Sequence, residues 1–159
     1  KRVRRAAIDA LCLHLKHFDE DLADGLLKAL KDPESEVAIA ALDMIATVAT
    51  KGDGRFIAAI VGCLRHRSTA VRNSAVDALR ELVEESDNVT QALLLDTFTE
   101  VVQTRRIAVV DALVAVVGLE NAKLALSDLC KVRAAEDSGT ELLVATQAAL
   151  KYLDEQCDD

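Results

Sequence analysis

The sequence predicts an all-α fold, a right-handed α-α superhelix (solenoid) built from helical hairpins. The main observation is a repeat of 34 residues, in which an aspartate recurs within the same short apolar segment. The repeated aspartates are Asp9, Asp43, Asp77 and Asp111. Hydrophobic residues form 51% of the chain, while one proline and six glycines leave few helix breakers. Self-similarity at this period is typical of stacked helical repeats that each contact only their neighbours.

The 159 residues are expected to form a single array. Its predicted parts are a half repeat at 1–18 and repeats at about 19–53, 54–87, 88–119 and 120–156. The half repeat holds a helix at about 2–17. Because the chain begins inside a repeat, we expect it to be a fragment of a longer protein.

The first full repeat begins with acidic residues at 19–21, followed by leucines on one helix face at positions 22, 26, 27 and 30. Asp32 is expected to cap the next helix, with Pro33 in its first position. That second helix carries an apolar stripe from Val37 to Val48, and residues 51–54 end it.

The later repeats keep the register of the first. Leu30, Leu64 and Phe98 are 34 residues apart, as the aspartates are. Apolar stripes at 56–64, 71–82, 94–98 and 109–116 predict the next two hairpins, and helices at about 121–132 and 140–153 form the last. This last hairpin departs from the repeat, because residues 134–139 lengthen its turn and Ala145 occupies the aspartate position.

The inter-helix turn and second helix resemble the HEAT repeat. The resemblance rests on Asp32-Pro33-x-x-x-Val37, on residues 71–79 (VRNSAVDAL) and on residues 3–11 (VRRAAIDAL), and it extends over essentially the whole chain. Ala38 replaces the usual arginine of the second helix. The resemblance implies a solenoid fold. It does not specify a function, because HEAT arrays serve as phosphatase scaffolds, transport receptors, tubulin binders and bilin-lyase-like proteins.

Charge and composition exclude several classes of function. The formal net charge of −8 argues against nucleic acid as the main partner, since phosphate binding needs a basic surface. No apolar run approaches the roughly 20 residues that span a bilayer. The cysteines Cys12, Cys63, Cys130 and Cys157 show no metal-binding spacing. We interpret the first three as buried thiols in a reducing, cytoplasmic compartment and Cys157 as exposed.

Catalytic, cofactor and metal signatures are not found in the sequence. His14 and His17, followed by Asp19 and Asp21, offer two imidazoles one helical turn apart, but no third ligand is set by the spacing. We interpret them as structural. No phosphate loop or nucleophile motif occurs, so we expect neither an enzyme nor a small-molecule substrate.

The aspartate row has two interpretations. In the structural one, each carboxylate is solvated or bonds a hydroxyl or arginine of the adjacent repeat. In the functional one, Asp9, Asp43, Asp77 and Asp111 line the concave side at intervals of about 10 Å and bind a basic extended or helical segment of a protein partner.

A second candidate surface is a basic edge at the turns between first and second helices, comprising Arg65, Arg67, Arg72, Arg105 and Arg106. Arginines near helix N-termini oppose the helix dipole, which suggests that they have partners. Bridges to neighbouring repeats are the structural interpretation of this edge.

These patterns favour a non-catalytic protein–protein interaction scaffold. The alternative is a bilin-lyase-like HEAT protein or chaperone-lyase that binds a small chromophore, which requires an apolar pocket with a Cys or His in its wall. A third hypothesis, nucleic-acid binding along the basic edge, predicts a steep loss of affinity with salt.

Overall fold

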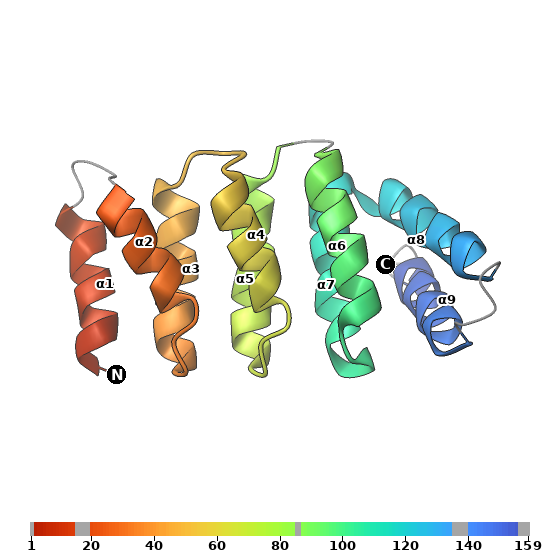
Figure 1. Cartoon of the computed structure of the whole chain (residues 1–159), viewed down its shortest axis with the longest axis horizontal. Coiled ribbons are helices and arrows are strands. Elements are labelled where there is room, and N and C mark those ends of the chain that lie inside the picture. The colour runs from red at the N-terminus through yellow and green to blue at the C-terminus, as the bar shows by residue number, and fades with distance from the viewer. Residues whose placement is uncertain (1, 15–19, 85–86, 135–139, 156–159) are drawn as a thin grey trace. The chain divides into compact units, whose positions relative to one another are not determined.

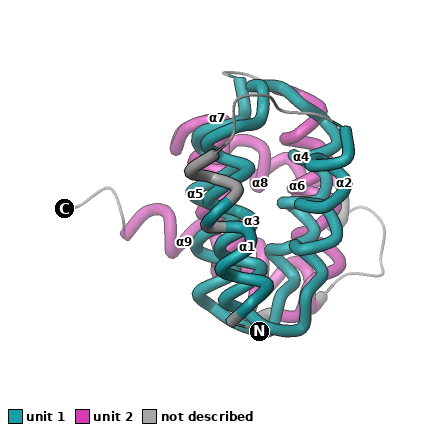
Figure 2. The backbone as a smooth tube through the Cα atoms, turned by 90° about the vertical axis from the view of Figure 1, so that its left-hand side faces the viewer, with its two compact units in different colours: residues 1–84 teal, residues 85–159 magenta. Residues whose placement is uncertain are grey.

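The computed structural model describes residues 2–14, 20–84, 87–134 and 140–155. All regular elements in these ranges are α-helices, with no strand among them (Figure 1). The helices pack as successive hairpins, so the predicted all-α fold of stacked hairpins is confirmed. The chain divides into two compact units, unit 1 (residues 1–84) and unit 2 (residues 85–159) (Figure 2).

Unit 1 consists of one helix followed by two helical hairpins. Its elements are α1 (Arg2–His14), α2 (Glu20–Ala29), α3 (Ser35–Val48), α4 (Gly54–Cys63) and α5 (Thr69–Leu82). Figure 2 shows α1, α3 and α5 in one layer and α2 and α4 in the other. In the first of these layers α3 contacts both α1 and α5, while α2 packs on α3 and α4 on α5. We call α1, α3 and α5 the second-helix layer of unit 1.

Small residues are buried at the same position in two helices of this layer. Ala41 of α3 and Ala75 of α5, which are 34 residues apart, are both fully buried. Leu30 and Leu64, the equivalent residues at the ends of the two first helices, are buried as well. The predicted register of both helices of the repeat is therefore confirmed in unit 1.

The turns of unit 1 satisfy the free backbone groups at helix ends. Asp53 caps α4, since its Oδ1 accepts a hydrogen bond from the backbone N–H of Arg55 (3.0 Å). Gly52 has a φ of +78°, which favours glycine, and its N–H donates to the carbonyl of Leu82 (2.8 Å). This bond joins the turn after α3 to the end of α5 and so ties two repeats together.

The expected capping role of Asp32 is wrong. α3 begins at Ser35, and the residue before it, Glu34, has extended backbone without a side-chain cap. Asp32 Oδ1 instead accepts from the N–H of Glu34 (3.0 Å), while its Oδ2 lies 2.7 Å from Nε of Arg4. The carboxylate is held in the turn by these two contacts, and Pro33 therefore precedes the helix rather than starting it.

Unit 2 contains two hairpins that pack against each other. Its elements are α6 (Asn88–Glu100), α7 (Gln103–Val117), α8 (Leu119–Ala134) and α9 (Thr140–Glu155). α6 pairs with α7, α8 pairs with α9, and α7 contacts both α8 and α9. Phe98, Leu113, Leu126 and Leu153 are buried between these helices.

The helix ends of unit 2 also follow local sequence. Asp87 caps α6 by accepting hydrogen bonds from the N–H groups of Val89 and Thr90 (2.9 and 3.2 Å). Gly118, with a φ of +80°, lets α8 begin at the next residue after it. The stretch 135–139, expected to lengthen the last turn, and residues 15–17, expected to extend the first helix, lie outside the described residues.

Candidate functional site

Two of the repeated aspartates are exposed on adjacent helices of unit 1. Asp43 lies on α3 and Asp77 at the equivalent place on α5, and these two helices pack against each other. The residues on either side of each aspartate in the sequence are buried. The carboxylates therefore emerge at the edge of the packed apolar stripe.

Further acidic residues share this exposed side. Glu36 precedes Asp43 by two helical turns, and Glu81 follows Asp77 by one. We call the exposed side of α3 and α5 that carries Glu36, Asp43, Asp77 and Glu81 the acidic face. Arg80 forms an ion pair with Asp77 (3.1 Å), in which the two side chains are 58% and 72% exposed. Such an exposed pair contributes little to stability and competes weakly with an incoming cation.

The other two aspartates are not part of this face as described. The side chain of Asp9, on α1, lies outside the described residues. Asp111, on α7 of unit 2, is half-buried and accepts a hydrogen bond from the hydroxyl of Tyr152 on α9 (3.1 Å). Burial, together with the charge of Asp111, raises the pKa of Tyr152. Asp111 thus forms the bond to a hydroxyl of the adjacent repeat that the structural interpretation anticipates.

Two arginines of the predicted basic edge make contacts inside unit 1. Arg72 donates from Nη1 to the carbonyls of His66 and Arg67 (2.9 and 3.2 Å) and from Nη2 to Oγ1 of Thr69 (2.9 Å). It closes the turn that precedes α5. Arg67 is exposed and donates to the carbonyl of Pro33 in the preceding repeat (3.3 Å).

The remaining arginines of the edge differ in exposure. Arg65 is exposed and Arg105 half-buried, whereas Arg106 is only 9% exposed. The Nε of Arg106 donates to the carbonyl of Phe98 (3.3 Å), and its guanidinium lies 5.6 Å from the centre of the Phe98 ring. Arg106 is therefore a buried residue of unit 2 rather than part of an exposed edge.

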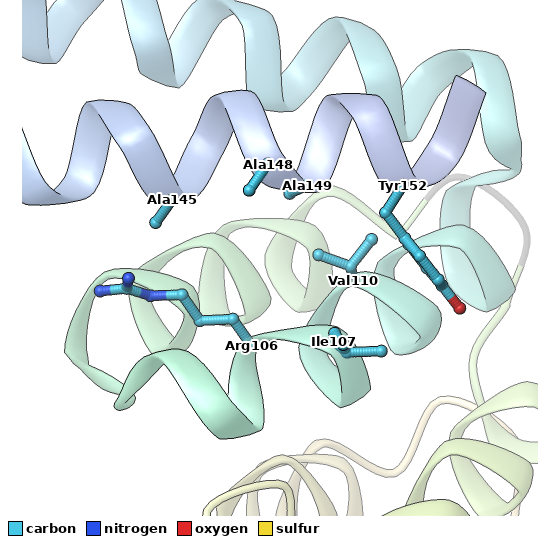
Figure 3. Close-up of a pocket in the computed structure, with 7 residues that line it drawn as sticks. All are labelled: Arg106, Ile107, Val110, Ala145, Ala148, Ala149 and Tyr152. Carbon is cyan, nitrogen blue, oxygen red and sulfur yellow. The ribbon is translucent and has the colours of Figure 1, made fainter. Parts of the chain in front are cut away.

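A pocket of about 150 Å³ lies between α7 and α9. Figure 3 shows Arg106 toward one end of it and Tyr152 toward the other, with alanines of α9 facing apolar residues of α7. The lining residues are Arg106, Ile107, Val110, Ala145, Ala148, Ala149 and Tyr152. We call this the α7–α9 pocket.

Sequence reasoning missed this pocket. It treated Ala145 only as a departure from the repeat, and it placed Arg106 in a row of exposed arginines. The signal that would reveal the pocket is the spacing of Ala145, Ala148 and Ala149, which puts three small side chains on one face of a helix that packs against α7. Missing side-chain volume at a helix interface leaves a hollow.

In the described part of the chain, no group of three or more His, Cys, Asp or Glu side chains is placed to hold a metal ion. The predicted burial of Cys63 is confirmed, and this burial raises the pKa of its thiol to about 11, which disfavours the nucleophilic thiolate. Cys130 is half-buried rather than buried. Cys12, Cys157, His14 and His17 have side chains outside the described residues. The bilin-lyase-like alternative requires a Cys or His in the pocket wall. None of the described residues that line the α7–α9 pocket is of either type.

Three further findings bear on classification. A protein-family model of HEAT repeats matches residues 23–114, which is more than half of the chain. No curated protein matches the sequence significantly. In the described ranges, none of the helices combines the length and apolarity that crossing a membrane requires.

Proposed function

The chain belongs to the HEAT-repeat family, and from this premise we propose that it is a non-catalytic, cytoplasmic protein–protein interaction scaffold. HEAT repeats generally mediate protein interactions and are typically non-catalytic. The proposed partner is a basic extended segment of another protein, and the proposed binding surface is the acidic face of unit 1.

The observation that carries this proposal is the repetition of an exposed carboxylate on two packed helices. Asp43 and Asp77 occupy the same position of successive repeats, and folding alone does not need a charge there. Packed helices lie about 8–10 Å apart, so a partner meets one carboxylate per repeat at that interval. With Glu36 and Glu81 on the same side, the surface favours fast, salt-sensitive association with a cationic chain.

The basic edge is less suitable for an acidic partner. Arg72 and Arg106 donate to backbone carbonyls of their own units, and a partner would have to replace these bonds. Of the edge residues in unit 1, Arg65 and Arg67 are the more exposed.

A peptide of four Arg-Pro-Pro repeats is a suitable probe for the acidic face. In a polyproline II helix every third residue lies on one side and advances by about 9 Å, which matches the spacing of packed helices. We expect Asp43→Asn with Asp77→Asn to weaken binding about fivefold at low salt, because each exposed ion pair contributes roughly 0.5 kcal/mol. Fluorescence anisotropy of the labelled peptide measures the affinity.

The matched control is Asp21→Asn with Asp24→Asn, which changes net charge equally but alters exposed residues of α2. It should leave the affinity nearly unchanged, and circular dichroism should show equal helicity in both variants. An equal loss of affinity in the control would show that net charge alone, rather than the acidic face, accounts for the weaker binding. Tighter binding of a Glu-Pro-Pro peptide, lost in Arg65→Gln with Arg67→Gln, would assign binding to the basic edge instead.

A further inference from the structure

Arg106 is a buried cation whose hydrogen-bonding capacity is only partly used. Its Nε donates to Phe98, but its buried Nη1 has no hydrogen-bond partner in the described part of the chain. A buried, incompletely paired guanidinium is costly to a fold. The contact of the guanidinium with the Phe98 ring offsets only part of that cost.

Comparison with the equivalent Arg4 shows one position at which Arg106 has no carboxylate. Arg4, Arg72 and Arg106 recur at multiples of the 34-residue period. Arg4 pairs with the carboxylate of Asp32, which follows it by 28 residues, at 2.7 Å. The residue that follows Arg106 by the same interval is Ala134. The repeat therefore supplies no carboxylate to Arg106 at the position where it supplies one to Arg4.

The adjoining pocket has room for a small apolar group. Its volume of about 150 Å³ equals that of cavities that hold benzene, and it is below the roughly 300 Å³ at which sites for drug-sized ligands begin. Ile107 lines the pocket and is 54% exposed, so the pocket is reached from the surface. Alanines of α9 face Ile107 and Val110 of α7 across it, as Figure 3 shows.

We propose that the α7–α9 pocket binds a small carboxylate whose apolar body is about the size of one ring, and that Arg106 donates hydrogen bonds to the carboxylate. The apolar body is held between α7 and α9, and the guanidinium turns toward the pocket as the acid enters, which pairs its unused N–H groups. Two sources share this chemistry: a free small acid, and the C-terminal residue of a peptide. The site uses residues of unit 2 and is separate from the acidic face.

Phenylacetate and its neutral isostere phenylacetamide test the proposal with the whole chain. Ligand-detected NMR titration should show at least tenfold tighter binding of phenylacetate. In Arg106→Met this preference should fall to about one, whereas Arg106→Lys should keep part of it. Ala148→Leu, which fills the pocket from an exposed position, should weaken both ligands, and Ala92→Leu at an exposed position of α6 should weaken neither.

A second comparison separates the two sources. Gly-Gly-Phe with a free C-terminus should displace phenylacetate, and its C-terminal amide should not, if the natural ligand is a chain end. Binding of phenylacetate without displacement by the peptide assigns the pocket to free acids. Either result supports the shared chemistry.

Three outcomes would overturn the proposal. The first is equal affinity for phenylacetate and phenylacetamide, or no saturable binding of either. The second is an acid preference that survives in an Arg106→Met variant whose urea unfolding shows it to be folded. The third is an unchanged phenylacetate affinity in Ala148→Leu, because a filled pocket cannot hold the apolar body.

Discussion

Asp32 holds the turn between α2 and α3 through two different contacts. The hydrogen bond from the N–H of Glu34, followed by the contact with the Arg4 guanidinium, holds the pKa of this carboxyl below its usual range. A carboxylate whose pKa is lowered in the folded state stabilises that state above its unfolded pKa of about 3.9, and this contribution is lost as the pH falls through the folded value. Asp32 therefore connects two repeats and makes their stability depend on pH.

Asp32→Asn should lower the free energy of unfolding at about pH 7, because the amide loses the charge that pairs with Arg4. The difference from the parent chain should shrink as the pH falls from about 4 through the lowered pKa of the folded state, because the parent carboxyl then becomes protonated as well. Urea unfolding at a series of pH values measures both. A difference as large at about pH 3 as at neutral pH would contradict this account.

The aspartates of the repeat differ in exposure and in hydrogen bonding, because the residues around each of them differ. Asp77 is exposed beside Arg80, whereas Asp111 is half-buried under the hydroxyl of Tyr152. The sequence predicted the register of both residues but not this difference, because Tyr152 lies 41 residues beyond Asp111 in a hairpin that departs from the repeat. The repeat period reveals equivalent positions, while their surroundings depend on residues that do not repeat.

At the scale of the element, α5 packs against α3, and each of these helices buries a small residue at the same position of the repeat. Ala75 is fully buried, and so is its equivalent Ala41. The sequence predicted these two positions because apolar residues recur there in each repeat. It failed at the start of α3, where the contacts of Asp32 with Glu34 and Arg4 outweighed the capping preference. It also missed the α7–α9 pocket, since a hollow depends on missing volume at a tertiary contact rather than on periodicity.

Ala75→Leu should overpack the contact between α5 and α3 and lower the free energy of unfolding by about 1–3 kcal/mol. Ala70→Leu makes the same chemical change at an exposed position of α5 and should cost much less. Asp77→Asn should also cost less than Ala75→Leu, as expected of an exposed side chain. Chemical denaturation compares the three variants. If Asp77→Asn proved the most harmful, the aspartate would be a structural residue.

For the whole molecule, the division into two units separates two kinds of candidate surface. Unit 1 carries the acidic face, in which repetition places carboxylates on successive helices. Unit 2 carries the α7–α9 pocket, where its last hairpin departs from the repeat. In a repeat protein each repeat contacts mainly its nearest neighbours, so a local departure from the repeat pattern is tolerated. We infer that the regular repeats and the divergent hairpin serve different ligands.

The central claim is that a basic segment binds the acidic face, and NMR mapping on the labelled whole chain tests it most directly. On titration with the Arg-Pro-Pro peptide, the largest amide shift changes should lie in α3 and α5 near Asp43 and Asp77, and they should diminish as salt is raised. The amides of α2 and α4 in unit 1 should change little. Largest changes in α2 and α4, or in the turn at residues 65–69, would contradict the account.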